Sequence, residues 1–420
     1  MAKEFLTAQE VLTRVDDQRR DPSDTPVDDS KKMRALNAIL DIISSRASFR
    51  FAVRAAQIAF YAGQPLYNIQ NQFGLDDFMD LKDVRPEVWA GRILDNVEAD
   101  EWARMVATGD RRPFVSINTQ DNYESLWINW YDYTKPEVIL ATQTDVDSWL
   151  ADTAGSDATN LHQDIGYFKY GNASLAFDID VSQSVNNYAR VYDAGLGAVD
   201  FSDHLNLSHG FQWVYIPATL VDYITSVKIE WGQSASAYWH QTKTTPANGD
   251  DWKAGWNLVE VAWDAATKVG SPDEGLTSFA AISVIYSASC PDITGVRVSK
   301  LSFSRPEFME LWYYSRYLVK DATTGARKRQ VEALEDKLLV PTEHKETLVE
   351  GVLWQVMDQM GSNNSSDSQN HLKLFEYGYD KDEQKTSRAK MGGMQLLLST
   401  YGVKKNSGKR RFRINPAVED

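Results

Sequence analysis

Few side chains in this sequence have the types and spacing that chemistry requires. Its six histidines are scattered along the chain, and even His204 and His209, five residues apart in a turn-rich segment, lack the spacing of a metal site. We find no phosphate-binding Gly-rich loop, no Gly-x-Ser-x-Gly elbow and no His-Glu-x-x-His helix. We therefore expect no enzymatic activity and assign no catalytic residue. The histidines are His162, His204, His209, His240, His344 and His371.

One pair of carboxylates has a spacing that could matter. Asp178 and Asp180 lie two residues apart in an alternating run, so a strand would place both on one face. A glycosidase needs two carboxylates opposed across a cleft, which this arrangement does not predict. We interpret the pair as part of a polar outer face, with a structural Ca²⁺ site as the alternative, because Ca²⁺ prefers several oxygen ligands. No other metal or cofactor is expected.

Tryptophans are the second chemical signal, because exposed rings can stack on the apolar faces of sugars. Trp213, Trp231 and Trp263 lie inside alternating strands and are expected in a core. Tyr238, Trp239 and Trp252 lie in segments flanked by turns and are our candidates for exposed, glycan-binding rings. Seven of the chain's 13 tryptophans lie between residues 145 and 304, namely Trp149, Trp213, Trp231, Trp239, Trp252, Trp256 and Trp263.

The elements that must position these rings are short strands. Residues 145–304 contain several apolar or alternating runs, each ended by Gly, Asn, Asp or Pro, with no helical pattern between them. Such a series is typical of an antiparallel sandwich or jelly roll. The runs are 174–181, 211–216, 226–231, 255–263, 282–286 and 295–299.

Composition limits the remaining possibilities. At 420 residues the chain exceeds the usual size of one core, which predicts two domains. Residues 141–304 hold 19 acidic and 8 basic side chains, so −11 of the net charge of −15 belongs to the sandwich, and nonspecific DNA binding there is disfavoured. The single cysteine, Cys290, excludes an internal disulfide. Without a long apolar run or a signal-peptide core, we expect cytoplasmic synthesis and no membrane contact.

The flanks predict mainly helices. Apolar residues recur every three or four positions in 33–43, and further helices are expected at 96–108, 347–360 and 369–391. We predict an α+β protein in which one helical domain is split by the sandwich, inserted between Ala141 and Pro306. The expected parts are 1–143 and 305–402 for the split domain, 144–304 for the inserted antiparallel β-sandwich (jelly roll), and 403–420 for a basic tail.

Two resemblances follow from particular stretches. Residues 170–178, 255–258 and 270–273 are similar to jelly-roll modules of the carbohydrate-binding type, found in phage structural proteins and glycan-active enzymes. Residues 36–46, 49–61, 64–69 and 310–321, with 324–325 and the helix from 347, resemble head-to-tail adaptor proteins of tailed bacteriophages. The roughly 160-residue insertion departs from that compact family, and no sugar-contact position is carried over from the modules.

The adaptor resemblance implies a homo-oligomeric ring, usually dodecameric, beneath the portal. Implied partners are the portal protein, downstream tail or neck proteins, and the genomic DNA that passes through the lumen. Candidates for the subunit interface are Trp127, Trp130, Tyr131, Leu311, Trp312, Tyr313 and Tyr314. Candidates for portal or DNA contact are the basic residues Lys404, Lys405, Lys409, Arg410, Arg411 and Arg413.

Our leading hypothesis from the sequence is a virion structural protein, located in the phage neck and assembled in the host cytoplasm, with an outward jelly roll that is either a decoration or a glycan-binding module. The alternative is a receptor-binding or fibre-attachment protein whose sandwich binds cell-surface polysaccharide. A polysaccharide-degrading enzyme has no carboxylate pair to support it.

Overall fold

The computed structural model describes residues 5–18, 27–87, 93–107, 114–120, 123–129, 137–146, 148–204, 207–359, 366–377 and 393–403. The chain divides into two compact units, the first comprising Met1–Ala56, Asp76–Val84 and Leu311–Asp420, the second Gln57–Leu75 and Arg85–Glu310. The bounds differ from the expected ones, because residues 57–75 and 85–143 group with the sandwich. No helix among the described residues is both long and apolar enough to cross a membrane.

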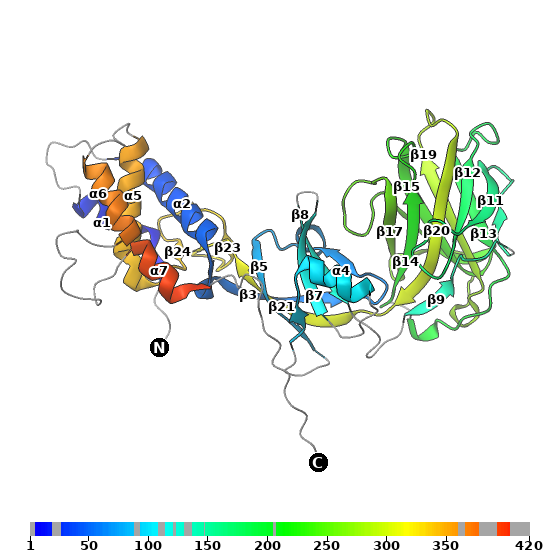
Figure 1. Ribbon diagram of the computed structural model, residues 1–420, viewed down its shortest axis with the longest axis horizontal. Coiled ribbons are helices and arrows are strands. Elements are labelled where there is room, and N and C mark those ends of the chain that lie inside the picture. The colour runs from blue at the N-terminus through cyan, green and yellow to red at the C-terminus, as the bar shows by residue number, and fades with distance from the viewer. Residues whose placement is uncertain are drawn as a thin grey trace, which may run out of the picture. The chain divides into compact units, whose positions relative to one another are not determined.

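Helices dominate the first unit and pack on one aliphatic core (Figure 1). In α2 (Asp29–Arg46), the stripe predicted from the sequence is confirmed, since Leu36, Ile39, Leu40 and Ile43 are buried. This stripe packs against α5 (Lys345–Gln359), which confirms the predicted helix at 347–360. The other helical elements are α1 (Ala8–Gln18), α6 (Ser366–Tyr377), α7 (Gly393–Tyr401), η1 (Arg50–Ala52) and η4 (Thr342–His344).

Two small sheets complete the first unit. A four-stranded sheet has the order β1-β24-β22-β23, and β2 pairs with β25. The strands are β1 (Leu6–Thr7), β24 (Lys337–Leu338), β22 (Val319–Lys320), β23 (Arg327–Lys328), β2 (Ser48–Phe49) and β25 (Gly402–Val403).

Three longer strands each contain a boundary between the residues of the first unit and those of the second. These are β3 (Val53–Phe60), β5 (Phe78–Pro86) and β21 (Glu307–Ser315), which form a sheet in the order β3-β21-β5. The strand expected at 307–315 is thereby confirmed. Asp77, before β5, accepts hydrogen bonds from Arg54 Nη1 (2.7 Å) and the Tyr313 hydroxyl (2.9 Å), all within the first unit.

The second unit begins with a small mixed sheet of order β4-β8-β7-β6. Asn68 caps α3 (Ile69–Phe73) by accepting hydrogen bonds from Gln70 N and Asn71 N, and Gly74, with φ of 62°, ends the helix in the left-handed conformation that favours glycine. The remaining elements are β4 (Leu66–Asn68), β6 (Asp95–Asn96), α4 (Ala99–Ala107), β7 (Phe114–Gln120) and β8 (Tyr123–Asn129).

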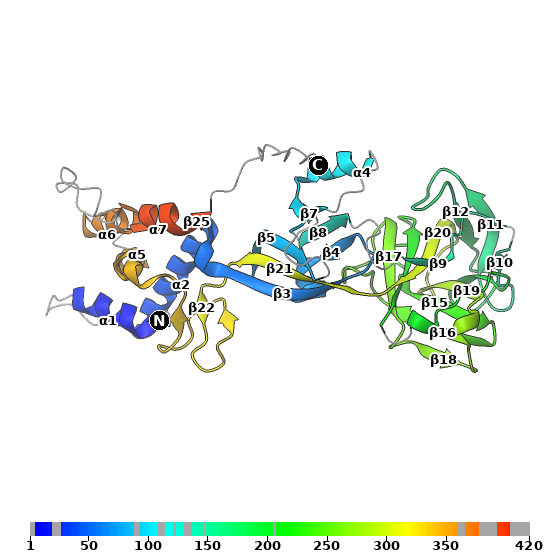
Figure 2. The ribbon, with the colours of Figure 1, turned by 90° about the horizontal axis from the view of Figure 1, so that it is seen from below.

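The rest of the second unit is an antiparallel β-sandwich, as predicted, and Figures 1 and 2 show its two layers. The first sheet has the order β11-β12-β20-β14-β17, with β9 also paired to β20. Its strands are β11 (Ala158–Asp164), β12 (Ser174–Ile179), β20 (Ile293–Ser304), β14 (His209–Ile216), β17 (Gly255–Ala262) and β9 (Val138–Ala141).

The second sheet of the sandwich has the order β10-β13-β19-β15-β16-β18. Its strands, with the two 3₁₀ turns of the sandwich, are β10 (Leu150–Ala151), β13 (Tyr188–Asp193), β19 (Phe279–Tyr286), β15 (Ile224–Ser234), β16 (Ala237–Lys243), β18 (Thr267–Val269), η2 (Ser202–His204) and η3 (Glu274–Leu276).

Aromatic rings fill the space between the two sheets. Trp263 is the centre of this cluster, with its ring centroid 5.6 Å from that of Trp231, 5.3 Å from Trp239 and 5.0 Å from Phe303. All four side chains are buried, and each removes a large apolar surface from water. Cys290 lies at the margin of the same core, 5 % exposed, and burial raises the pKa of its thiol.

Candidate functional site

The outward face of the first sheet carries a group of aromatic rings. Val214 and Ile216 of β14 face the core, so the alternate residues Trp213 and Tyr215 project to the opposite side. The register places Trp256 of β17 directly opposite Tyr215, and their ring centroids lie 5.6 Å apart. Figure 1 shows β17, β14 and β20 side by side.

The loop between β11 and β12 adds further rings to this face. Tyr167 lies with its ring centroid 5.7 Å from that of Tyr215, and three aromatic residues of the loop are well exposed: Tyr167 at 54 %, Phe168 at 43 % and Tyr170 at 38 %. The face therefore presents rings that water can reach. We call Trp213, Tyr215, Trp256, Tyr167 and Tyr170 the outer aromatic face.

Arg297 fixes the loop on the sheet. It is the β20 partner of Tyr215, and its guanidinium carbon lies 4.7 Å from the ring centroids of both Tyr167 and Tyr215. Its Nε donates to Asp164 Oδ2 at 2.6 Å. Burial acts to raise the pKa of Asp164, but the bonds from Arg297 and the Gly166 amide outweigh it and hold that pKa below its usual range. Tyr167 is thereby pre-positioned beside Tyr215.

A bulge in β20 brings a second cation to the face. Between Ser299 and Leu301 the pairing with β14 shifts by one residue, and the extra residue, Lys300, has a φ of 54°. Its Nζ lies 5.3 Å from the Tyr170 ring centroid and 2.7 Å from Glu137 Oε1. The charge of Lys300 is therefore neutralised by Glu137.

Lys169 differs from these two cations. Its Nζ lies 4.8 Å from the ring centroid of Trp213, and it makes no ion pair with a carboxylate among the described residues. Surrounding protein atoms lower the pKa of its amine by desolvation. Lys169 is thus the amine of this face that remains available to a ligand.

The other end of β14 is covered by its own unit. The Tyr61 ring stacks on His209, with centroids 4.3 Å apart, and contacts Phe211, which is fully buried. A Cβ added at Gly63 would lie 2.5 Å from the Phe211 ring, so the turn that covers this end requires glycine. Among the residues that the structure describes, the half of the strand around Trp213 and Tyr215 is the part left open to a ligand.

The three glycan-binding residues predicted from the sequence differ in exposure, because two of them are buried and one points outward. Trp239 and Trp252 are buried, at 1 % and 7 % exposure, so the expectation that they are exposed is wrong. Trp239 faces inward because it pairs with Trp231, whose side chain also lies in the core. Tyr238, one residue earlier, does point outward, on the second sheet. Burial of Trp231 and Trp263 is confirmed, whereas Trp213 was wrongly expected in the core.

The outward face of the second sheet has a different character. Arg190 pairs with Glu230 and Asp152, at 2.7 and 2.8 Å, and Lys228 pairs with Glu230 at 2.7 Å. Tyr238 lies 5.8 Å from Lys228 Nζ. Because these charges are paired with one another, this face offers a ligand fewer unsatisfied groups than the outer aromatic face.

Asp178 and Asp180 do point into a polar region, where protein donors already bind them. Asp178 accepts from Asn160 Nδ2 and the Gly295 amide, at 2.7 and 2.8 Å. Asp180 accepts from Ser182 and Gln183, and these bonds lower its pKa. Within the described ranges, no group of three or more His, Cys, Asp or Glu could hold a metal ion, so the Ca²⁺ alternative gains no support.

Three of the seven expected interface residues lie inside the protein. Leu311 and Tyr313 are fully buried and Tyr314 is 8 % exposed, so these three cannot form a subunit surface, and that expectation is wrong. Trp312 is half-buried under Lys82 Nζ, and Trp127 packs on Trp102. The remaining candidates, Trp130, Tyr131, Lys404, Lys405, Lys409, Arg410, Arg411 and Arg413, lie outside the described residues.

No protein-family model matches the sequence, and no curated protein matches it. Similar solved structures include the family 30 carbohydrate-binding module of a cellulosomal cellulase from Clostridium thermocellum, at 10 % identity and a TM-score of 0.29, covering 40 % of this chain and 98 % of that one. A CBM27 module from Caldicellulosiruptor saccharolyticus, solved with mannohexaose, is 9 % identical with a TM-score of 0.28, and the match covers 41 % of this chain and 97 % of that one. A domain of tailspike protein 4 of bacteriophage CBA120 is 8 % identical with a TM-score of 0.25, and the match covers 40 % of this chain and 21 % of that one. Likenesses this low carry no argument about function.

Proposed function

We propose that the β-sandwich is a carbohydrate-binding module and that its ligand lies on the outer aromatic face. The observation that carries this proposal is the row of accessible rings across β14, β17 and the loop before β12, with Trp213, Tyr215 and Trp256 at its centre. Aromatic rings match the apolar C–H faces of sugar rings, and a chain of sugars can extend over several of them.

Polar groups beside the rings would orient the sugar hydroxyls. Arg297 and Lys300 are held in place by Asp164 and Glu137, and Lys169, which pairs with no carboxylate among the described residues, lies over Trp213. Few conformational changes are then needed on binding, because Arg297 already fixes Tyr167 beside Tyr215. The face combines a rigid aromatic platform with hydrogen-bond donors.

We propose binding without turnover. Asp164 and Glu137, the acidic partners of Arg297 and Lys300 on this face, are each in an ion pair, at 2.6 and 2.7 Å. A glycosidase would need one carboxyl group protonated and a second opposed to it across the scissile bond. A carboxylate whose pKa is held low beside a guanidinium, as in Asp164, is unsuited to act as the acid.

A glycan array probed with the full-length chain, followed by calorimetry on the best ligand, tests the proposal. We expect Trp213→Ala and Trp256→Ala to weaken binding by roughly tenfold or more, since each removes a ring from the centre of the site. Trp213→Phe keeps a ring and should retain most of the affinity.

Tyr238→Ala is the matched control, because it removes an outward ring from the opposite sheet. Binding should be unchanged in this variant. If Tyr238→Ala abolishes binding while Trp213→Ala leaves it intact, the site lies on the second sheet. If no glycan on the array binds, the proposed function fails altogether.

A second candidate function is assembly into a phage particle. It rests on the resemblance of residues 36–69 and 310–321 to head-to-tail adaptors, whose segments form α2, β3 and β21 in the structure. Under this proposal the first unit joins a ring below the portal, and the sandwich is the glycan-binding attachment. Native mass spectrometry with purified portal protein should show a ring, and a chain that stays monomeric would count against it.

A further inference from the structure

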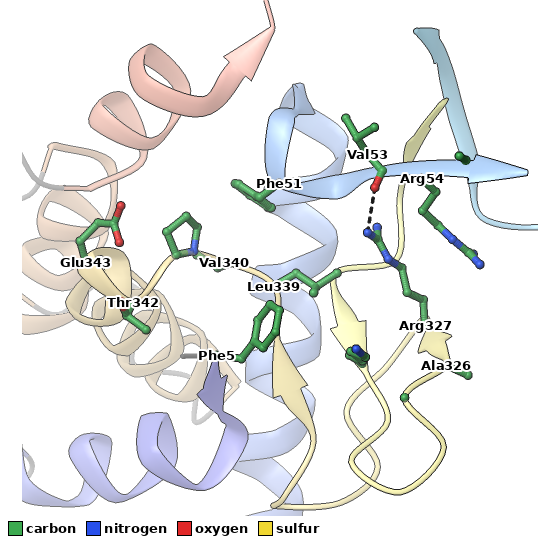
Figure 3. A pocket seen from close by; sticks show the side chains of 14 residues that line it. Phe5, Phe51, Val53, Arg54, Ala326, Arg327, Leu339, Val340, Thr342 and Glu343 are labelled. Atoms are coloured by element: carbon green, nitrogen blue, oxygen red, sulfur yellow. Dashed lines mark hydrogen bonds between the residues drawn. The ribbon is translucent and has the colours of Figure 1, made fainter. Parts of the chain in front are cut away.

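The first unit contains a pocket that none of the preceding functions uses. It has a volume of about 610 Å³, a size typical of sites for small ligands. Its walls come from Phe5 before β1, from Phe51 of η1 and residues 53–55 of β3, from the β22–β23 hairpin, and from residues 339–343 after β24. Figure 3 shows these side chains gathered around the pocket.

One wall of the pocket is positively charged. Lys320 and Arg327 occupy directly opposite positions on β22 and β23, so their side chains leave the hairpin on the same face. Like charges in such a cross-strand pair repel each other. Neither makes an ion pair with a carboxylate in the part of the chain that the structure describes. The pair is therefore a local excess of positive charge.

The position of Arg327 is also electrostatically unfavourable. Its guanidinium donates to the carbonyl oxygens of Ala52 and Val53, at 2.9 and 3.0 Å, and the latter bond is drawn in Figure 3. Burial and the nearby charge of Arg54 lower the pKa of Arg327. Arg54 itself is compensated by Asp77, at 2.7 Å. An anion beside Arg327 would relieve this arrangement.

The other walls of the pocket are largely apolar. Phe5, Phe51, Val53 and Leu339 contribute hydrocarbon surface, and Phe5 remains 37 % exposed. Glu343 is the one acidic residue among the fourteen that line the pocket, and it accepts a hydrogen bond from the Tyr401 hydroxyl. A ligand would therefore meet an apolar surface on one side and, on the other, Lys320 and Arg327, in addition to Arg54, which is paired with Asp77.

The hairpin that carries the two cations is braced from outside. Lys328, beside Arg327, forms ion pairs with Asp321, Glu332 and Asp336, at 3.3, 3.2 and 2.8 Å. The backbone amide and the hydroxyl of Thr324 and the backbone amide of Thr323 also donate to Asp321. These bonds hold the pKa of Asp321 at about 2. The cationic wall is thus held in position before any ligand arrives.

We infer that this pocket binds a small organic anion whose apolar body lies against Phe5 and Phe51 and whose acidic group lies between Lys320 and Arg327. Charge-assisted hydrogen bonds from the ammonium and guanidinium groups would provide specificity for the acid. The inference is independent of glycan binding, since every residue that lines the pocket belongs to the first unit.

Titration of the full-length chain with 8-anilinonaphthalene-1-sulfonate tests the inference by fluorescence, because the probe joins an aromatic body to a sulfonate. The neutral N-phenyl-1-naphthylamine has the same body without the charge. We expect the sulfonate to bind at least roughly tenfold more tightly than the neutral probe, and Lys320→Gln to remove roughly tenfold of that affinity.

Two further variants separate charge from folding. Lys320→Arg keeps the charge and should keep the affinity, whereas Lys169→Gln, on the sandwich, should leave the affinity unchanged. Equal binding of the charged and neutral probes, or unaltered sulfonate binding by Lys320→Gln, would overturn the inference. Loss of binding in Lys169→Gln would also overturn it, by placing the probe on the sandwich.

Discussion

The sandwich contains two sets of aromatic residues that look alike in the sequence and lie in opposite environments. Trp231 and Trp239 lie between the sheets, 0 % and 1 % exposed, and contact Trp263. Trp213 and Trp256 lie on the outward face of the first sheet, beside Tyr215 and below a loop with exposed rings. The side of the sheet on which a ring lies, rather than its type, decides whether it stabilises the fold or is available to a ligand.

Burial between the sheets also explains why the outward rings can be rigid. We call Trp231 and Trp239, with Trp263, the inner set, and Trp213 and Trp256, with Tyr215, the outer set. The strands that carry Trp213 and Trp256 are fixed by core residues at alternate positions, such as Val214 and Val259, which are fully buried. A platform on regular strands holds its side chains more accurately than one on loops. The loop that supplies Tyr167 is the exception, and Arg297 ties it to the sheet.

The largest expected effect comes from the inner set. Trp239→Ala should lower the free energy of unfolding of the sandwich by about 3–5 kcal/mol, because it leaves a cavity in the core. Trp213→Ala should lower it by about 1 kcal/mol or less, since the outer ring is partly hydrated. Urea denaturation followed by near-ultraviolet circular dichroism measures both. A fully stable Trp239→Ala variant would contradict the separation of the two sets.

The next largest effect is on glycan affinity and tests which ring of the outward face binds the ligand. Replacing Tyr215, which contacts Trp256, Tyr167 and Arg297, should weaken glycan binding by roughly tenfold, or about 1.4 kcal/mol. Calorimetry on Tyr215→Ala measures this, with Tyr215→Phe as the control that keeps the ring. If the two variants bind equally poorly, the hydroxyl rather than the ring is responsible.

A smaller effect is expected at Arg297. Arg297→Gln removes the guanidinium between Tyr167 and Tyr215 and leaves Asp164 without its ion pair, which should cost about 1 kcal/mol of stability. Hydrogen exchange should then increase at residues 164–173 and stay unchanged in β15. If the loop is equally protected in the variant, Arg297 is not what fixes it.

The smallest effect is a dependence on pH. Burial lowers the pKa of His204 and of His240, helped by Arg305 and Lys228 respectively. The folded sandwich therefore favours neutral histidine, and the unfolded chain binds more protons as the pH falls below about 6.5. Stability should decrease between pH 7 and pH 5, and His240→Gln should decrease that slope in pH-dependent urea denaturation. An unchanged slope would show that His240 does not contribute.

Strand and helix positions in this chain could largely be predicted, because their patterns are local. The apolar stripe of α2 and the alternation in β12 both follow from spacing alone. The direction of side chains in β14 could not be predicted. Phe211, Trp213 and Tyr215 are apolar, and so are Val214 and Ile216, so either set could have faced the core. The strands that pair with β14 decide the matter, and they are distant in the sequence.

The candidate sites were harder to predict for the same reason. Trp239 lies in a segment that looks like a turn, and its burial follows from pairing with Trp231. Lys320 and Arg327, the charged pair of the pocket, lie seven residues apart in the sequence. They become neighbours because the residues between them form a tight hairpin. Contacts with Tyr61 that cover half of β14 come from about 150 residues earlier in the chain.

Cys290 makes the opening of the sandwich measurable by thiol labelling. It is the one cysteine in the chain, 5 % exposed, and the raised pKa of its thiol keeps the reactive thiolate scarce in the folded state. A thiol reagent added to the native protein can therefore react only when this margin of the core opens. The rate of labelling reports how often the sandwich exposes its interior, and it does so without any introduced probe.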